Sequence, residues 1–423
     1  MSPSLPDILL IVTDDMRDSD WHALPRIRQL VADRGTVFPN FFLTTPLCSP
    51  SRTSMLTGMY AHNHQVLHNS GADGGVAQFQ NRDLEAVSLP THLKSIGYRT
   101  ALVGKYLNGM AETGHIPGGW DDWMVSTELP YYSPVMNDNG HAHRFGKKYS
   151  TDVLRDRAIE IIDATEATQP LFLMFSSKAP HGPATPARRD RGAFARRHRE
   201  RSPDFNEEDV SDKPAYLRQR AKMSEAAIDR DESSRLASLV ATDDAVAAIL
   251  GVMQANGRLE NAYIFVMSDN GWAAGSHRWD SKSLAYNATA RVTMAASGPR
   301  FVRGQTDTRL AANIDIAATI ADAAQAQFDR GDGISLLDTA TRDAVALESW
   351  SVGYMAVRTA RHLYIENESG ERELYDYDID PYELENLLAD WEGHAPLPGA
   401  ESLAATLKAR LDALRTCAGS TCR

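Results

Sequence analysis

Four short apolar runs, rich in β-branched residues, lie within the first two thirds of the chain, at residues 7–13, 100–103, 171–175 and 263–267. Each run is nearly continuous and does not alternate between apolar and polar positions. Such runs are typical of strands that are buried on both faces of a parallel sheet. We therefore expect these four segments to form the centre of one sheet.

Segments with helical periodicity lie between these runs. The spacing of apolar residues predicts helices over 89–96, 153–164 and 234–254, and Gly257 is suited to end the last of them. Strands that alternate with helices in this way indicate a doubly wound α/β core. In such a core the active residues sit just beyond the carboxyl ends of the strands.

The pattern changes after about residue 340. Residues 351–365 and 373–376 are typical of short strands in an antiparallel hairpin, and residues 404–414 predict a closing amphipathic helix. We therefore expect a catalytic α/β domain over residues 1–340. A small α+β subdomain with an antiparallel sheet is expected over residues 341–423.

A polar, charged stretch without clear periodicity covers residues 188–214. We expect it to be an excursion over the active-site face and not a linker. Its first part, residues 188–201, is dense in arginine. This part is either a solvated surface segment, which we favour, or a local positive field for an anionic substrate. The net charge of the whole chain is −12, which argues against general nucleic-acid binding.

Length and composition are those of an ordinary globular protein. The 423 residues are 43% hydrophobic and 24% charged, and no apolar run approaches the roughly 20 residues that span a bilayer. The N-terminus has no basic start and runs directly into a strand pattern, so we expect no signal peptide and a cytoplasmic location for the chain as written. A secreted or periplasmic location follows instead if an export signal has been removed.

The three cysteines are too few for a disulfide scaffold. Cys417 and Cys422 lie close together at the end of the chain. They either close a small loop, which favours an oxidising compartment, or are two free thiols. The third cysteine, Cys48, stands alone in the sequence.

Chemically reactive side chains follow each of the four expected strands. In chain order they are Asp14, Asp15, Lys105, His181, Asp269 and Asn270. A single aspartate at a strand end often caps a helix, but adjacent carboxylates with a second Asp-Asn pair make an oxygen-rich set that suits a hard cation. The lack of a His/Cys cluster argues against zinc. Calcium fits best because it tolerates irregular coordination, and magnesium is second.

A second motif begins at Cys48, with a proline two residues later and Arg52 two residues after that. One interpretation is a buried, inert cysteine ahead of a helix, since Pro50 suits a first helical turn. The other is a nucleophile site, in which Arg52 projects onto the same helix face one turn away.

With these motifs in this order, the chain resembles the type I sulfatases of the alkaline-phosphatase-like superfamily over nearly its whole length. The resemblance rests on the acidic pairs, the Cys48 motif, Lys282 and the segments 104–108, 179–181, 268–271 and 373–386. Segments 61–64 and 104–108 look most like N-acetylglucosamine-6-sulfatases and related glycosaminoglycan sulfatases. The resemblance implies a three-layer sandwich around a mostly parallel central sheet.

The resemblance also implies a set of roles. A separate maturation enzyme converts the cysteine to formylglycine, whose hydrated aldehyde is the nucleophile. Calcium is bound by five residues, Asp14, Asp15, modified Cys48, Asp269 and Asn270. Orientation of the nucleophile, binding of sulfate and protonation of the leaving oxygen fall to four more, Arg52, Lys105, His181 and Lys282.

Three positions depart from the family pattern. Leu107 stands where many arylsulfatases have a histidine that assists the elimination of sulfate. His277 is either a substitute that contacts the substrate or an ordinary loop histidine. Asn287 stands where relatives often carry glutamate, which we expect to affect packing more than chemistry.

These observations favour a calcium-dependent sulfatase acting on a sulfated sugar or a small aryl or alkyl sulfate. One alternative enzyme is a phosphonate monoester or phosphodiester hydrolase of the same superfamily, because a phosphoryl group has the same tetrahedral shape. An alternative of another class is a non-catalytic binder of sulfated glycans in which Cys48 stays unmodified. The full set of catalytic candidates argues against the binder.

Overall fold

The four apolar runs form neighbouring parallel strands at the centre of a large sheet in the computed structural model, which describes residues 5–111, 114–126, 130–195, 201–389 and 394–423. In spatial order they are β8 (Ala262–Ser268), β1 (Asp7–Asp14), β7 (Leu171–Pro180) and β3 (Arg99–Gly104). Every residue of β1 and β8 is buried, which explains their apolar sequences. The expected α/β core is confirmed.

Shorter strands extend this block on both sides into a mixed sheet of eleven strands. Beyond β3 lie β4 (Asp122–Val125), in parallel, and the antiparallel strands β5 (Val135–Asp138) and β6 (His141–Arg144). Beyond β8 lie β9 (Arg291–Ser297) and β2 (Thr36–Phe42), both antiparallel to their inner neighbours, and then β10 (Gln305–Thr306) and β11 (Ala311–Ala312). The sequence did not reveal these strands, because they are short or partly polar.

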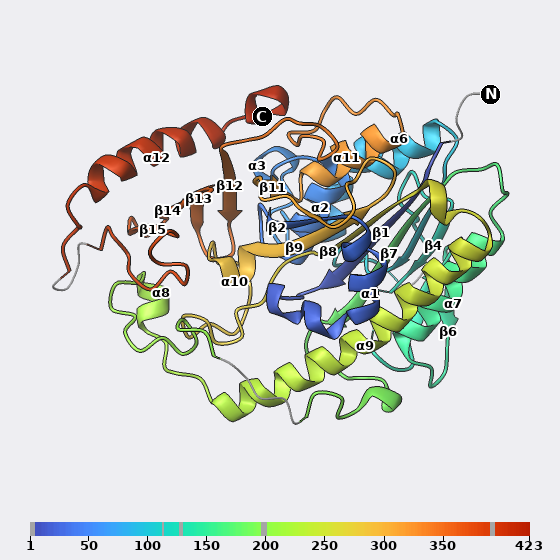
Figure 1. Ribbon diagram of the computed structural model, residues 1–423, viewed down its shortest axis with the longest axis horizontal. Helices are drawn as coiled ribbons and strands as arrows, with labels where there is room; N and C mark the ends of the chain where they lie inside the picture. Colours follow the sequence, from blue (N-terminus) through green and yellow to red (C-terminus); the bar gives the residue numbers. More distant parts are fainter. Residues whose placement is uncertain (1–4, 112–113, 127–129, 196–200, 390–393) are drawn as a thin grey trace.

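Helices cover both faces of the sheet, so the fold has three layers (Figure 1). Alternate residues of β1 point to opposite faces: Leu10 packs with the helices of one layer, and Leu9 and Ile11 with those of the other. The first layer contains α2 (Cys48–Thr57), α4 (Gly75–Asn81), α6 (Leu89–Ser95) and α11 (Asp315–Ala323). The second contains α1 (Pro25–Leu30), α7 (Ser150–Asp163) and α9 (Glu225–Ala255).

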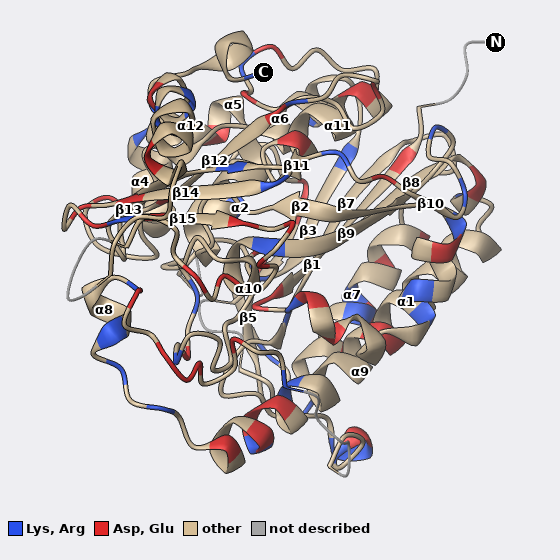
Figure 2. Cartoon of the chain, turned by 60° about the vertical axis from the view of Figure 1, so that its left-hand side comes forward, with Lys and Arg blue, Asp and Glu red and all other residues tan. Residues whose placement is uncertain are grey.

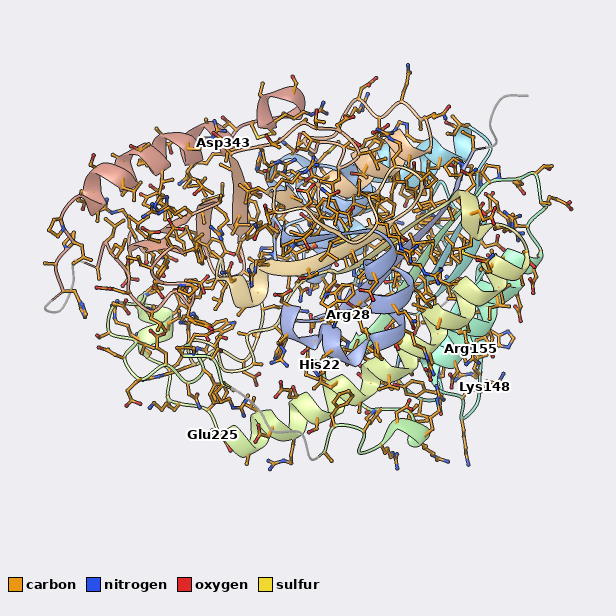
Figure 3. All side chains as sticks on the ribbon, viewed as in Figure 1. His22, Arg28, Lys148, Arg155, Glu225 and Asp343 are labelled. Carbon is orange, nitrogen blue, oxygen red and sulfur yellow. A yellow bond between two sulfur atoms is a disulfide. The ribbon has the colours of Figure 1, made fainter. Side chains whose placement is uncertain are left out.

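Helix α9 is longer than the expected helix over 234–254, because it begins at Glu225 (Figure 3). Within the described part of the chain, it is the helix that is long and apolar enough, by composition, to cross a membrane. The expectation that no apolar run reaches that length was therefore wrong. However, 67% of its apolar window is buried inside the molecule, where it packs on α7 and β7. Burial in the core accounts for its composition.

Short helical segments connect these elements. They are η1 (Asp18–Ala23), η2 (Ala32–Arg34), α3 (Ala61–His64), α5 (Leu84–Val87), η3 (Arg188–Asp190), α8 (Ala215–Arg218), η4 (Leu259–Asn261), α10 (Asn287–Ala290) and η5 (Gly419–Cys422).

A separate antiparallel sheet forms near the C-terminus, as expected (Figure 1). Its strands are β12 (Ala344–Ser349), β13 (Tyr354–Thr359), β14 (His362–Asn367) and β15 (Arg372–Asp376), covered by α12 (Ala400–Leu414). The division into domains at residue 340 stays a prediction, since Phe42 and Tyr60 pack in the same core as this sheet. Cys417 and Cys422 form a disulfide.

The polar excursion over residues 188–214 is described except for residues 196–200. Arg189 pairs with Asp152, and Arg201 with Asp229, so these two arginines are engaged by carboxylates. Basic and acidic residues are interspersed over the described chain (Figure 2). The end of the excursion pairs with the loop that follows β8, through a bridge between Phe205 and Ser276.

We predict that Gly104→Ala destabilises the protein, because Gly104 lies at the end of β3 with φ +122° and a Cβ there would stand 1.8 Å from the Ser176 carbonyl oxygen. Overpacking against backbone costs about 1–3 kcal/mol of unfolding free energy. The measurement is urea denaturation. The matched control is Gly97→Ala, which has φ +97° and open space around the new methyl group. Equal losses in the two variants would show that backbone conformation alone, and not the close approach of β7, accounts for the effect.

Candidate active site

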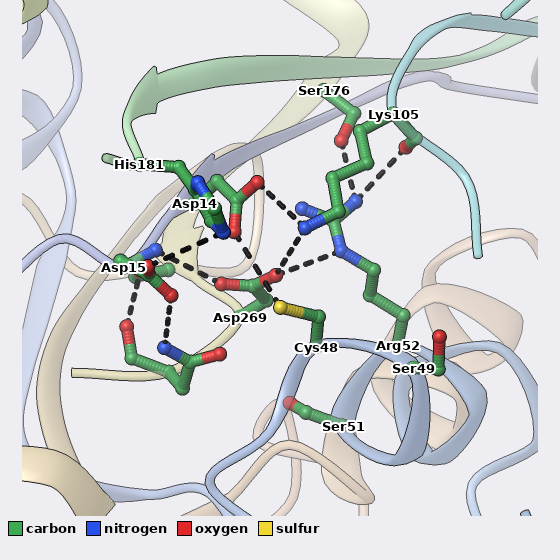
Figure 4. A network of polar contacts seen from close by, with 12 residues as sticks. Asp14, Asp15, Cys48, Ser49, Ser51, Arg52, Lys105, Ser176, His181 and Asp269 are labelled. Carbon is green, nitrogen blue, oxygen red and sulfur yellow. Dashed lines mark hydrogen bonds and ion pairs between the residues drawn. The ribbon is translucent and has the colours of Figure 1, made fainter. Parts of the chain in front are cut away.

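Asp14 and Asp15 lie together at the carboxyl end of β1 and are buried. Asp15 has a left-handed backbone, with φ 66°, which is unusual for a residue with a side chain. Neighbouring groups hold it there: its N–H donates to Asp269 Oδ1 at 3.1 Å, and its carbonyl accepts from Arg235 Nη2 at 2.6 Å. The conformation turns the two adjacent carboxylates toward the same space (Figure 4).

Asp269 and Asn270 come from the end of the next strand, β8. The parallel register pairs Thr13 with Ser268, so the two acidic pairs follow their strands at the same level. Asn270 Nδ2 donates to Asp15 Oδ1 at 2.6 Å. The structure thus brings together the four oxygen-bearing side chains that the sequence suggested as metal ligands.

Cys48 is the first residue of α2, a helix whose residues are all buried. Its sulfur lies 3.7 Å from Asp14 Oδ1 and 2.8 Å from Lys282 Nζ. Pro50 stands in the first turn of the helix, where no backbone hydrogen bond is lost. The thiol therefore faces the carboxylate pair directly, so the motif around Cys48 does more than begin a helix.

Three cations surround the carboxylates. Arg52 donates from Nε to Asp269 Oδ2 at 2.8 Å and from Nη1 to Ser176 Oγ at 2.6 Å. Lys105 Nζ donates to Asp14 Oδ2 at 2.6 Å, and Lys282 Nζ to Asp15 Oδ1 at 2.5 Å. The three cations come from α2, the end of β3 and the loop after β8, so they converge only in the folded chain.

His181 lies on the open side of the cluster, opposite Lys105 and Arg52 (Figure 4). Its Nδ1 is 2.6 Å from the carbonyl oxygen of Gly182, and because a carbonyl can only accept, Nδ1 carries the proton of this bond. The other nitrogen, Nε2, is 3.7 Å from Asp15 Oδ2, and the side chain is 34% exposed. Nε2 is therefore the ring atom that can exchange a proton with a bound molecule.

The charges of the site shift the pKa values of its acids in different directions. Burial alone would raise the pKa of Asp14, but Lys105, His181 and Arg52 outweigh it and hold that pKa well below its usual range. At Asp15, burial and the neighbouring Asp14 would raise the pKa, but Lys282, His181 and Arg235 together lower it. At Asp269, burial and the neighbouring Asp14 prevail and raise the pKa.

Burial also raises the pKa of the Cys48 thiol, against the pull of Lys105 and Lys282. A cysteine that acts as a nucleophile needs the opposite, a lowered pKa that yields thiolate near neutral pH. The unmodified thiol is also a soft ligand among hard oxygen donors. Cys48 as such fits poorly with catalysis, although its position is central.

The donor set fits a hard divalent cation. Two buried oxygens that face the cluster, Asp15 Oδ2 and Asn270 Oδ1, have no hydrogen-bond partner among the described residues. Possible ligand atoms of Asp14, Asp15, Cys48 and His181 all lie within 4.8 Å of one another. A buried carboxylate oxygen without a partner is costly, and a cation would relieve that cost.

His277 does not join this cluster in the described part of the chain. Its Nδ1 is 2.6 Å from Glu207 Oε2 and its Nε2 is 3.7 Å from Glu383 Oε2, and the side chain is fully buried. Both nitrogens face protein carboxylates, and Nε2 makes no hydrogen bond to a described residue. The expected substrate-binding role of His277 stays a prediction. Leu107 packs in the hydrophobic core. Asn287 begins α10, where its N–H donates to Glu383.

Sequence reasoning missed Arg235 and Ser176. Arg235 is buried within α9, binds the Asp15 carbonyl and lies over the ring of Trp272 at 4.9 Å. Its sequence context gave no clear signal, because it follows the polar and charged residues 229–234 and looks like one more exposed position of the helix. Ser176 gave no signal, because a serine within a strand is unremarkable until the register places it beside Lys105.

Comparison with known proteins gives consistent matches. The sulfatase family model matches residues 6–326. The chain is 28% identical to N-acetylglucosamine-6-sulfatase of the goat, Capra hircus, over 99% of this chain and 85% of that protein. A structure solved in complex with its substrate D-glucosamine-2-N,6-O-disulfate has a TM-score of 0.78 at 22% identity, covering 96% of this chain and 97% of that one. A phosphonate monoester hydrolase from Silicibacter pomeroyi has a TM-score of 0.72 at 18% identity, covering 98% and 96%. These two structures share the fold.

We predict that calcium raises the thermal denaturation midpoint of the protein, and that magnesium raises it less. Asn270→Ala removes one of the two unpartnered oxygens and should reduce the calcium-induced shift by more than half, because the stabilisation by a ligand rises with the logarithm of its affinity for the folded state. Asn40→Ala, on the distant strand β2, is the control and should keep the full shift. An undiminished shift in Asn270→Ala would place the calcium elsewhere.

Proposed function

The chain belongs to the sulfatase family and is a sulfuric ester hydrolase, and from this premise we propose that it cleaves the sulfate ester of a sulfated sugar by means of a calcium ion and a formylglycine made from Cys48. The observation that carries the proposal is the position of Cys48. Its sulfur lies between Lys282 Nζ and the carboxylate of Asp14, where a nucleophile and a metal ligand are needed at once.

Modification removes the chemical mismatch at Cys48. Oxidation of its Cβ to an aldehyde, with loss of the sulfur, replaces a protonated, soft thiol by oxygen atoms that suit the site. The step is a two-electron oxidation and needs a separate maturation enzyme with its own oxidant. Because Cys48 is fully buried, that enzyme must reach it before the chain folds.

The two absent groups would supply complementary chemistry. Bound by Asp14, Asp15, Asp269 and Asn270, calcium would place positive charge beside the attacking oxygen. A hydrated aldehyde at position 48, held between Lys282 and Asp14, would supply an oxygen nucleophile in place of the thiol.

The residues of this chain perform the remaining tasks. Lys105 and Lys282 direct their ammonium groups into the site, where they stabilise negative charge on the sulfuryl oxygens. Arg52 holds Asp269 and Ser176 of β7 in place. His181 gives a proton from Nε2 to the leaving oxygen, since its Nδ1 is held by Gly182.

Charge balance supports an anionic substrate. The carboxylates of Asp14, Asp15 and Asp269 formally offset the cations of Arg52, Lys105 and Lys282. A divalent cation would make the site positive within a chain of net charge −12, and so attract a sulfate ester locally.

Sulfated sugars are the favoured substrate class. The goat relative is named for N-acetylglucosamine 6-sulfate, and the first structural neighbour holds a sulfated glucosamine. The second candidate function is phosphonate monoester hydrolysis, which the likeness to the Silicibacter enzyme favours. The ratio of kcat/KM for a sulfate ester to kcat/KM for a phosphonate monoester decides between the two candidate functions.

The location of the protein stays a prediction. The Cys417–Cys422 disulfide favours an oxidising compartment over the cytoplasm that the N-terminus suggested.

We predict that protein produced together with a formylglycine-generating enzyme carries an aldehyde at position 48 and hydrolyses an aryl sulfate. Mass spectrometry of the tryptic peptide spanning residues 35–52 detects the aldehyde by its reaction with a hydrazide. Cys48→Ala should abolish turnover. A phosphonate monoester assayed in parallel should have the lower kcat/KM, and the reverse order would favour the second candidate function. An unmodified thiol without turnover would favour a binder of sulfated glycans.

We predict that His181→Ala slows alkyl and sugar sulfates far more than p-nitrocatechol sulfate. A poor leaving group depends on the proton from Nε2, whereas a nitrocatechol leaves without one, and general acid catalysis contributes about 10²–10⁴-fold. The measurement is kcat for the two substrates. Equal losses would show that His181 binds sulfate without protonating the leaving oxygen.

A further inference from the structure

Lys282 reaches the site from a loop, residues 271–283, whose backbone is unusual. Ala274, His277 and Arg278 all have left-handed conformations, with φ of 49°, 50° and 58°. Each such residue costs free energy and persists only where its surroundings hold it. The loop therefore depends on contacts from outside itself.

Contacts within the loop connect its tip to Lys282. Ala273 N–H donates to Ser281 O at 2.9 Å, and Gly275 N–H donates to Trp279 O at 2.8 Å. The indole Nε1 of Trp279 donates to the carbonyl oxygen of Lys282 at 3.0 Å. A shift of the tip is thus transmitted along these bonds to the backbone of Lys282.

His277 stands at the tip and is held by three groups. Its backbone N–H donates to Asp204 O at 2.8 Å, its Nδ1 is 2.6 Å from Glu207 Oε2, and its Nε2 is 3.7 Å from Glu383 Oε2. The ring also packs on Tyr286, with centroids 4.5 Å apart. Glu207 belongs to the segment before α8 and Glu383 to the C-terminal region, so the histidine joins three separate parts of the chain.

The two carboxylates are themselves fixed. Glu207 lies 3.2 Å from Lys213 Nζ, a buried lysine. Glu383 accepts from the Asn287 N–H at 2.8 Å and from the Tyr377 hydroxyl at 2.6 Å. Since neither carboxylate is free to turn away, the histidine between them is held in one position.

Electrostatics favour a charged ring. Burial would lower the pKa of His277, but Glu207 and Glu383 outweigh it and raise the pKa to about 9. The groups that face the ring are these two carboxylates, the phenol of Tyr286 and, through Glu207, the ammonium of Lys213. Because the folded pKa lies above the usual 6.5, the stabilisation is fully present below pH 6.5 and is lost as the pH rises through about 9.

We propose that His277, as an imidazolium between Glu207 and Glu383, is a positioning residue that holds the loop 271–283 and so sets Lys282 against Asp15 and the side chain at position 48. The inference rests on the proposed function, in which Lys282 is part of the catalytic site. In this role His277 does not replace the histidine that many arylsulfatases have at the position of Leu107.

The first test is His277→Gln, which keeps a hydrogen-bond donor but removes the charge. We expect kcat/KM for an aryl sulfate to fall by about 10- to 100-fold, as when a catalytic group moves by about an ångström. Wild-type activity should fall as the pH rises through about 9, and this alkaline decline should be absent in the variant. The matched control is His141→Gln, at an exposed position of β6.

Amide hydrogen exchange of residues 271–283 gives a readout that does not need turnover. We expect exchange in His277→Gln to be faster by about tenfold or more in this loop, because its local opening becomes easier, and unchanged in β1. If the wild-type protein hydrolyses no sulfate ester, the proposed function fails, yet the exchange rates still decide the role of His277. Unchanged exchange, or an unchanged alkaline decline, would overturn the proposal.

A second variant covers the case in which His277→Gln does not fold. Glu383→Gln keeps the shape and one oxygen for Asn287 and Tyr377, and replaces the charged oxygen that faces Nε2 by an uncharged amide NH2. Its histidine should lose the proton more easily, so the alkaline decline should move to lower pH. A decline that stays at the wild-type pH would contradict the proposed charge pair.

Discussion

The structure depends on opposite charges that are brought together and largely buried at one edge of the sheet. Asp14, Asp15 and Asp269 are each fully or almost fully buried, and each is paired with a cation from another part of the chain. Burial of unpaired carboxylates would be prohibitive, and paired ones are stable only in good geometry. The site therefore constrains the strands that present the acids and the segments that supply the cations.

The register of the parallel strands meets this constraint. Thr13 pairs with Ser268 and Gly104 with Ser176, so the ends of β1, β8, β3 and β7 lie at one level. Side chains 267 positions apart in the sequence thereby meet within hydrogen-bond distance, as Lys282 meets Asp15. The same register places the Ser176 hydroxyl within hydrogen-bond distance of Arg52. The carbonyl oxygen of Ser176 accepts from the backbone N–H of Lys105.

Two distant regions support the site from outside. Glu207 and Glu383 hold the loop that carries Lys282, and Arg235 holds the left-handed backbone of Asp15. The C-terminal sheet shares a hydrophobic core with Phe42 and Tyr60, which lie on either side of α2 in the sequence. The C-terminal region is thus connected to both the nucleophile helix and the Lys282 loop, which explains why a hydrolytic site needs nearly the whole chain.

The sequence by itself determined the central strands, the helices between them and the residues that gather at the strand ends. Continuous apolar runs such as residues 7–13 and the paired carboxylates after them carry this information locally. Only the tertiary structure decided the roles of His277, Arg235 and Ser176. Their partners lie 70, 220 and 124 positions away, in Glu207, Asp15 and Arg52. A histidine in a loop looks the same in sequence whether it faces a substrate or two buried carboxylates, because the difference lies in how distant segments pack.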